Sequence, residues 1–249
     1  MSDIILYQFP ASHYNEKVRW ALDLKQVPHR RISLLPGPHA PKMKRLTGRT
    51  HTPVLVIGDE VVAGSSAILA YLEQNYPDPP LEPVDQGERE RALAIATTFD
   101  KQVGPAVRLA KFFEVMNGEF AIRTFCAEKS PLVRTLYRAG FPLVHQVMQR
   151  SMAINAENAM KGREETERAL DYVVRESGPG GYLVGNNFSV ADLTCAALLM
   201  PAVAVADLGG PALANTDAER AWLQRWADHP GAAWVREIYR RHRHPEKPL

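Results

Sequence analysis

Short apolar runs alternate with amphipathic stretches along the first 80 residues of the chain. Residues 15–25 place Val18, Ala21 and Leu22 at helical spacing, and residues 66–76 repeat that pattern, so both segments are predicted to be helices. Residues 42–46 favour a short helical turn, after a loop that Pro36, Gly37, Pro38 and Pro41 impose. Short apolar runs predict strands at 4–9, 54–57 and 60–63, and the alternation of polar and apolar residues predicts one at 31–34.

Two features of this first unit follow from the same pattern. The last two strands are separated by Gly58-Asp59, which is typical of a hairpin turn. On the helix at 15–25, the charged residues lie between the apolar positions and are expected to face solvent. Those charged residues are Glu16, Lys17, Arg19 and Asp23.

The segment Pro77-Asp78-Pro79-Pro80 predicts an extended boundary, beyond which strand signals almost vanish. We therefore expect an α/β domain of βαβ-ββα order at 1–80, a linker at 81–87 and an all-helical domain at 88–249. The first helix of the all-helical domain, 88–116, should break near Gly104-Pro105. Further helices are predicted at 131–150, 160–177, 189–206, 217–228 and 231–242.

The sharpest local signal in the second half is the stretch from Phe188 to Leu193. Ser189 and Asp192 have the spacing of a capping box, in which each side chain accepts a hydrogen bond from the other residue's backbone N–H. Phe188 and Leu193 occupy the positions of a hydrophobic staple. This motif is structural and predicts the start of a helix.

Composition restricts the possible functions. The chain has 249 residues, is 45% hydrophobic and 23% charged, and has a net charge of +2, so no strong nucleic-acid or membrane interaction is implied. The basic run 240–244 is interpreted as a solvated tail. Cys126 and Cys195 are expected to be buried free thiols rather than a disulfide or a metal site. Because no basic leader precedes the first apolar run, we expect a cytoplasmic protein.

Two short segments together predict a socket for a carboxylate. Thr52-Pro53-Val54-Leu55 is a strand entered through a proline, and Gly64-Ser65-Ser66 opens a helix on two hydroxyl groups. A helix N-terminus presents unpaired N–H groups and a partial positive charge, which favour an anion. The pattern indicates binding of a small, acidic, peptide-like molecule.

These segments, in order, resemble the cytosolic glutathione transferases, and the serine-type, theta-, zeta- and omega-like classes in particular. The likeness rests on Leu6-Tyr7-Gln8-Phe9 with Ser12 to Leu22, on Thr52 to Leu55, on Ser65 to Leu72, and on the box at Ser189 and Asp192. It implies a thioredoxin-like domain followed by a helical domain, with glutathione as co-substrate and no metal. It also implies a small hydrophobic electrophile as second substrate and a cytoplasmic homodimer.

The resemblance assigns roles to residues of the socket. It implies that Pro53 is cis, that the backbone of Val54 pairs with the cysteinyl part of glutathione, and that Ser66 takes the γ-glutamyl carboxylate. Ser65 stands where relatives usually carry Glu or Gln, so it should hold the γ-glutamyl amine more weakly. His51 stands in the place of a lysine that would bind the glycine carboxylate, and His39 and Arg49 are the other candidates.

Glutathione chemistry needs a hydroxyl that stabilises the thiolate at the end of the first strand. Ser12, Tyr7 and Tyr14 are the candidates, and Ser12 falls where the serine-type classes keep their catalytic serine. Without a cysteine at this position, thiol–disulfide exchange through an enzyme cysteine is not expected, whereas conjugation, isomerisation and peroxide reduction remain open.

The second substrate is expected between the loop at 10–14 and the long helix. Arg108 would favour an acidic electrophile, and Asp100 is a candidate for the amine of glutathione in the partner subunit, as in some relatives. The competing hypothesis is a binding or regulatory module that kept the fold and lost the chemistry. The side chains of the long helix expected beside the cleft are Phe99, Val103, Arg108, Phe112 and Phe113.

Overall fold

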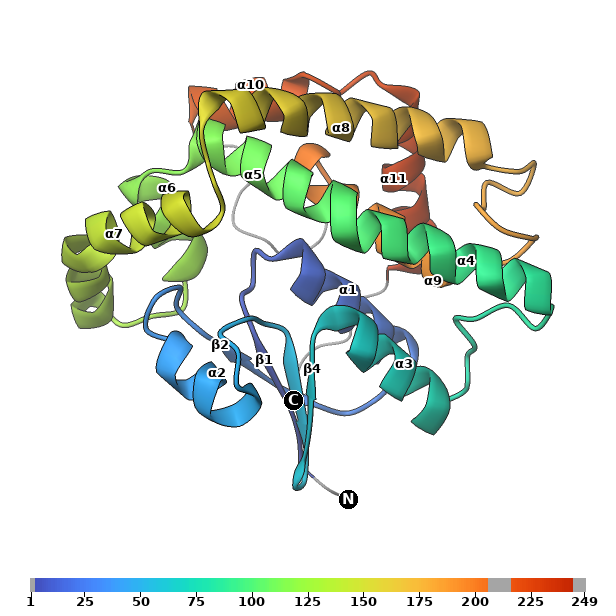
Figure 1. Ribbon diagram of the computed structural model, residues 1–249, viewed down its shortest axis with the longest axis horizontal. Helices are drawn as coiled ribbons and strands as arrows, with labels where there is room; N and C mark the ends of the chain where they lie inside the picture. The colour runs from blue at the N-terminus through green and yellow to red at the C-terminus, as the bar shows by residue number, and fades with distance from the viewer. Residues whose placement is uncertain (1–2, 206–215, 244–249) are drawn as a thin grey trace.

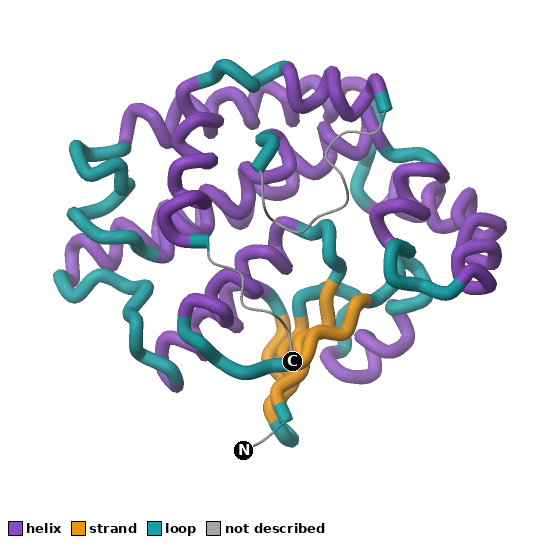
Figure 2. Tube along the Cα trace, turned by 180° about the vertical axis from the view of Figure 1, so that it is seen from behind, coloured by secondary structure: helices purple, strands orange, loops and turns teal. Residues whose placement is uncertain are grey.

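The computed structural model describes residues 3–205 and 216–243. A four-stranded mixed sheet in the order β2-β1-β3-β4 lies at one edge of the molecule, and helices cover the rest (Figures 1 and 2). β1 pairs in parallel with β2 and antiparallel with β3, which pairs antiparallel with β4. The elements of this part are β1 (Ile4–Gln8), α1 (His13–Leu24), β2 (Arg30–Ser33), α2 (Ala40–Thr47), β3 (Val54–Ile57), β4 (Glu60–Ala63) and α3 (Ser65–Asn75).

The remaining described elements are helices. α4 and α5 form one long rod that packs against α8, while α6 and α7 lie together at one end of the molecule, beyond α2 (Figure 1). None of the described helices is both long and apolar enough to span a membrane. These elements are α4 (Gln86–Thr98), α5 (Gly104–Val115), α6 (Gly118–Phe125), α7 (Pro131–Ser151), α8 (Ala156–Glu176), α9 (Val190–Leu199), α10 (Asp217–Gln224) and α11 (Pro230–His242).

The strands and most helices confirm the predicted pattern, with shifts at their ends. α1 begins at His13, two residues before the predicted start, because Ser12 caps it. The predicted loop through Pro41 is wrong: α2 begins at Ala40 and keeps Pro41 in its first turn, where a missing N–H costs little. α6 was not predicted. α9 is followed by a 3-10 turn (Met200–Ala202), so the predicted helix at 189–206 is too long, and residue 206 lies outside the described residues.

The long helix is interrupted just before the predicted break. A π-helical turn (Phe99–Val103) joins α4 to α5, and its final hydrogen bond runs from the Gly104 N–H to the Phe99 carbonyl. Pro105, which has no N–H to donate, follows directly. Asp100 lies within this π turn and reappears in the candidate site.

α1 is buried on all sides, which corrects the prediction of a solvated charged face. Glu16 is 3% exposed and Lys17 1%, because the sheet lies on one side of α1 and the helical part covers the other. Glu16 pairs with Arg19 at 2.7 Å and with Arg243 at 2.7 Å, and Arg243 also pairs with Asp23 at 2.8 Å. The prediction of a solvated tail at 240–244 is therefore wrong for Arg243, which is a buried counter-ion, and residue 244 lies outside the described residues.

The start of α9 confirms the capping box. Asp192 accepts hydrogen bonds from the Ser189 N–H at 2.9 Å and from the Leu183 N–H at 2.8 Å, so it also fixes the preceding loop. Burial outweighs these bonds and raises the pKa of Asp192 to about 6. Cys126 and Cys195 are buried free thiols, as predicted.

Candidate functional site

Ser12 lies between β1 and α1, at the N-terminus of the helix. Its hydroxyl oxygen accepts a long hydrogen bond, 3.4 Å, from the Asn15 N–H, and it donates to none of the residues that the structure describes. The hydroxyl proton is thus available to a ligand. The positive end of the α1 dipole lies beside it, an arrangement that stabilises a negative charge.

The two tyrosine candidates are placed differently. Tyr7 packs with Met43 and Val54 on the sheet face below α2, and the Lys42 ammonium lies 4.1 Å from the centre of its ring. The Tyr14 hydroxyl donates to the Asp100 carbonyl at 2.7 Å, and burial raises its pKa. Ser12 is therefore the candidate that lies at the start of the helix and whose hydroxyl donates no hydrogen bond to a described residue.

The segment around Pro53 is tied to both helices of the candidate site. The Thr52–Pro53 peptide bond is cis, as the resemblance implied, and Val54 pairs with Tyr7 and Ala63 in the sheet. The Asn15 side-chain amide donates to the Thr52 hydroxyl at 3.2 Å. On the other side, the Gly64 N–H donates to the Pro53 carbonyl at 2.9 Å. These bonds bring the starts of α1 and α3 to the same loop.

α3 begins with its N–H groups uncapped by any side chain. Gly64, the N-cap residue, has φ 96°, a conformation that favours glycine. Ser65 is buried, while Ser66 is exposed and donates from its hydroxyl to the Asp100 carboxylate at 2.5 Å. A carboxylate of the chain itself thus lies on the serine that was expected to bind a ligand carboxylate.

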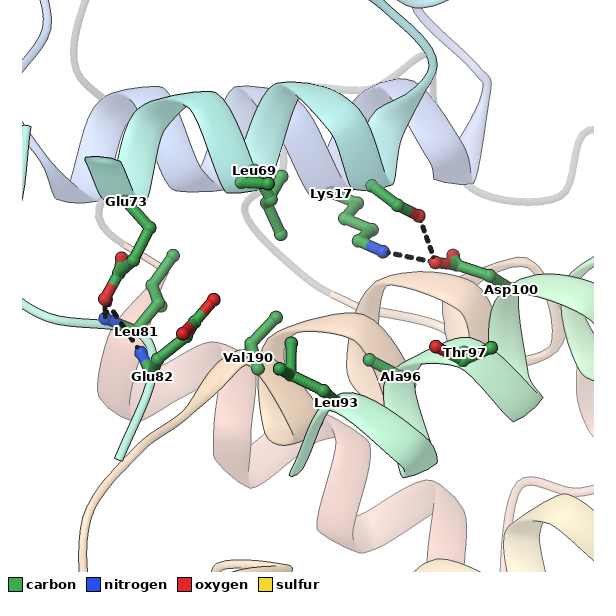
Figure 3. Close-up of a pocket in the computed structure, with 12 residues that line it drawn as sticks. Lys17, Leu69, Glu73, Leu81, Glu82, Leu93, Ala96, Thr97, Asp100 and Val190 are labelled. Carbon is green, nitrogen blue, oxygen red and sulfur yellow. Dashed lines mark hydrogen bonds and ion pairs between the residues drawn. The ribbon is translucent and has the colours of Figure 1, made fainter. Parts of the chain in front are cut away.

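Lys17 completes this cluster. Its ammonium lies 2.7 Å from the same Asp100 oxygen, as Figure 3 shows. Burial lowers the pKa of Lys17, and the charge of Asp100 opposes this shift. The second carboxylate oxygen of Asp100 is buried and has no hydrogen-bond partner. A cavity lined also by Leu69 and Thr97 extends from this point between α3 and α4.

The three candidates for a glycine carboxylate lie on two loops that contact each other. The His39 Nε2 lies 2.8 Å from the Thr50 carbonyl, its ring packs edge-on against Phe9, and burial lowers its pKa. His51 and Arg49 are exposed on the neighbouring loop. The described residues also hold no group of three or more His, Cys, Asp or Glu that could bind a metal ion.

Comparison with known proteins supports this reading of the fold. Residues 6–80 match the family model described as "Glutathione S-transferase, N-terminal domain". A carnation (Dianthus caryophyllus) protein named "Glutathione S-transferase 1" is 36% identical over 42% of this chain, which spans about half (49%) of that protein's length. The "Probable maleylacetoacetate isomerase" of Caenorhabditis elegans is 26% identical over 80% of this chain and 78% of its own.

The first domain of the chain thus matches the N-terminal domain of the glutathione S-transferases. A solved structure from Methylobacterium radiotolerans, a glutathione S-transferase in complex with glutathione sulfonate, shares the fold. Its TM-score is 0.64, its sequence identity 21%, and the match covers 100% of this chain and 98% of that one.

Relative to the predicted glutathione S-transferase site, the structure adds two lysines that sequence reasoning missed. Lys17 had been assigned to a solvated face, because its partner Asp100 is 83 residues away. Lys111 follows Arg108 by one helical turn on α5 and forms no ion pair within the described part of the chain. The i,i+3 spacing of Arg108 and Lys111 was the signal that could have revealed this pair.

Arg108 and Lys111 both act on the residues that follow Ser12. The Arg108 guanidinium carbon is 6.0 Å from the centre of the Tyr14 ring, and its Nε is buried without a hydrogen-bond partner. Burial, then the charge of Arg108 and that of Lys111, lower the pKa of His13 to about 3, so His13 is neutral. Burial lowers the pKa of Lys111 to about 8, which leaves it mostly charged at neutral pH.

Proposed function

We propose that this chain is a glutathione transferase that binds glutathione at the starts of α1 and α3 and activates its thiol for attack on a small electrophile. The observation that carries the proposal is the Ser12 hydroxyl, which donates to no described residue and lies at the N-terminus of α1. Conjugation, isomerisation and peroxide reduction all begin with such a thiolate.

The thiolate is the chemical requirement. A free thiol has a pKa of about 8.5, and lowering it by two units takes about 2.7 kcal/mol. A hydrogen bond from Ser12 to the sulfur contributes about 1.5–3 kcal/mol, because its acceptor is charged. The dipole of α1 adds to this in the same direction. Together these effects account for a thiol that is largely ionised at neutral pH.

The peptide would lie along the start of β3. In this proposal the backbone of Val54 pairs with the cysteinyl part, while Ser65, Ser66 and the first N–H groups of α3 hold the γ-glutamyl carboxylate. For this, the Ser66 hydroxyl must give up its hydrogen bond to the Asp100 carboxylate and donate to the ligand carboxylate instead. The unpartnered oxygen of Asp100 then accepts a hydrogen bond from the γ-glutamyl ammonium of the glutathione that is bound to the same chain. His39 and His51 border the glycine end.

The second substrate is, in this proposal, a carboxylate-bearing electrophile. Arg108 and Lys111 supply two positive charges beside Ser12 that no described carboxylate fully neutralises, since Glu219, which acts on Lys111, is already paired with Arg123. The name of the Caenorhabditis elegans relative, a probable maleylacetoacetate isomerase, also points to an acidic substrate. This replaces the hydrophobic electrophile expected from the family as a whole.

Calorimetric titration with reduced glutathione tests the peptide site. We expect binding by the wild type, and Asp100→Asn and Ser66→Ala should each weaken it about tenfold or more, the loss of one hydrogen bond to a charged group. Unchanged affinity in both variants would contradict the assignment. A chloronitrobenzoate and the matching chloronitrobenzamide test the second site. Arg108→Gln should lower the ratio of their kcat/KM values about tenfold, whereas the exposed Arg168→Gln should not change it.

One observation favours the second candidate, a non-catalytic binding or regulatory module. Asp100 occupies Ser66 in the structure, so a permanent Ser66–Asp100 bond would keep the socket closed to glutathione. In that case the wild type would give no heat with glutathione, and Asp100→Asn would open the site. The same titration therefore separates the two functions by the sign of the effect.

We also propose, from the family alone, a cytoplasmic homodimer with a glutathione-binding domain at 1–80, a linker at 81–87 and an electrophile-binding domain at 88–249. Light scattering that gives the 27.8 kDa mass of one chain would contradict the dimer.

A further inference from the structure

α7 has two apolar faces, and only one of them is covered. Tyr137, Phe141 and Met148 are buried, and the Tyr137 hydroxyl donates to the Pro36 carbonyl at 3.1 Å, which fixes the helix to the loop before α2. On the opposite side, large apolar side chains are exposed to solvent. They are Leu132 (69%), Leu136 (63%), Leu143 (68%) and Val147 (58%).

These side chains form one continuous stripe. Their spacing along the helix, with Ala139 and Gly140 between Leu136 and Leu143, places all six residues on one side of α7. On the side of α7 that carries these apolar residues, no charged residue lies between Leu132 and Val147. Arg134 lies on another side of the helix, where its guanidinium donates hydrogen bonds to the carbonyls of Cys126 and Ala127. We call this surface the α7 stripe.

The α7 stripe is self-complementary. Leu132 and Val147 lie equally far from the midpoint between Ala139 and Gly140, and Leu136 and Leu143 also lie equally far from it. A two-fold axis through that midpoint would therefore place each large residue of one helix opposite a large residue of an antiparallel copy. The two smallest residues would lie at the crossing, where helix backbones must approach closely.

The occupant that fits this pattern is a second copy of the chain. We propose that two chains associate through antiparallel α7 helices, with Ala139 and Gly140 at the two-fold axis. The stripe lies at the end of the molecule away from α3 and α4 (Figure 1), and it is the buried face of α7, not the stripe, that contacts the loop before α2.

The area sets the expected strength. Leu and Val side chains bury about 60–120 Å² each when fully covered, so the eight of two copies supply roughly 500 Å² at their present exposure. With the flanking helix surface the total approaches about 1,000 Å², the lower limit for a specific interface. We therefore expect a weak, concentration-dependent association through this surface, in addition to the homodimer proposed above.

Sedimentation equilibrium over a range of concentrations tests the association on the full chain. The average mass of the wild type should rise with concentration, and Leu136→Glu should abolish that rise. Val174→Glu, at an exposed apolar position on α8, should leave it unchanged. A Leu136→Glu mass curve identical to that of the wild type would overturn the proposal, whether the wild type is a monomer or a dimer formed elsewhere.

Disulfide trapping tests the orientation. An equimolar mixture of Leu136→Cys and Leu143→Cys chains should cross-link mainly between the two variants, because the antiparallel arrangement places these positions together. The native cysteines are buried and should not compete. Cross-links mainly within each variant would indicate a parallel arrangement and overturn the geometry. A wild type that stays monomeric but binds anionic lipid vesicles through the stripe would assign the surface to a membrane instead and also overturn it.

Discussion

Ser12 has two physical roles in the proposed mechanism, and Ser12→Ala removes both. The hydroxyl oxygen caps α1 by accepting the Asn15 N–H, and the hydroxyl proton would donate to the sulfur of bound glutathione. The cap bond is long, 3.4 Å, so its loss should reduce the free energy of unfolding by only about 0.5–1 kcal/mol, the lower part of the range for N-caps. The fold should therefore survive the substitution.

The effect on the thiolate should be larger. Losing a hydrogen bond of about 1.5–3 kcal/mol to a charged acceptor raises the pKa of the bound thiol by about one to two units. From a starting pKa of about 6.5, this rise lowers the thiolate fraction at pH 7, and with it the rate, by roughly 4- to 40-fold. Affinity for glutathione should change much less, because the γ-glutamyl and cysteinyl contacts lie elsewhere.

Ultraviolet titration of the thiolate in the glutathione complex measures that pKa directly, and steady-state kinetics with a chloronitrobenzoate give the rate. Tyr14→Phe is the matched control: it removes a hydroxyl two residues away that donates to the Asp100 carbonyl, so the thiol pKa should not move. The reasoning is refuted if Ser12→Ala leaves both the thiol pKa and the rate unchanged, or if Tyr14→Phe produces the shift instead.

Three further substitutions test the buried charges through denaturant unfolding. Lys17→Met should cost about 3 kcal/mol by leaving Asp100 without its counter-ion, and adding Asp100→Leu should recover most of it. Arg243→Met should cost a similar amount, whereas the exposed Arg240→Met should cost less than about 0.5 kcal/mol; equal losses would contradict this account. Because the folded pKa of Asp192 is raised to about 6, its contribution to stability is present below about pH 4 and lost as pH rises to 6. The stability of Asp192→Asn relative to wild type should thus rise by about 3 kcal/mol across that window, and a flat difference would disprove the shift.

Local sequence signals determined most of the architecture. The strands at 54–57 and 60–63 and the start of α9 were predicted within a residue, because hairpin turns and capping boxes depend on neighbours in the chain. The segments that carry Ser12, Pro53 and Ser66 were recognised for the same reason. α6 escaped detection. α2 was taken for a shorter turn, because a proline in the first turn of a helix looks like a helix breaker in the sequence.

Tertiary structure alone decided which charged residues are buried and which groups they meet. Periodicity placed Glu16 and Lys17 on a solvated face, yet both are buried, because partners far along the chain, Arg243 and Asp100, neutralise them. The same long-range packing puts Asp100 on Ser66. Helical spacing records where apolar side chains lie, whereas the burial of a charge depends on a counter-charge that only the folded chain brings within hydrogen-bond distance.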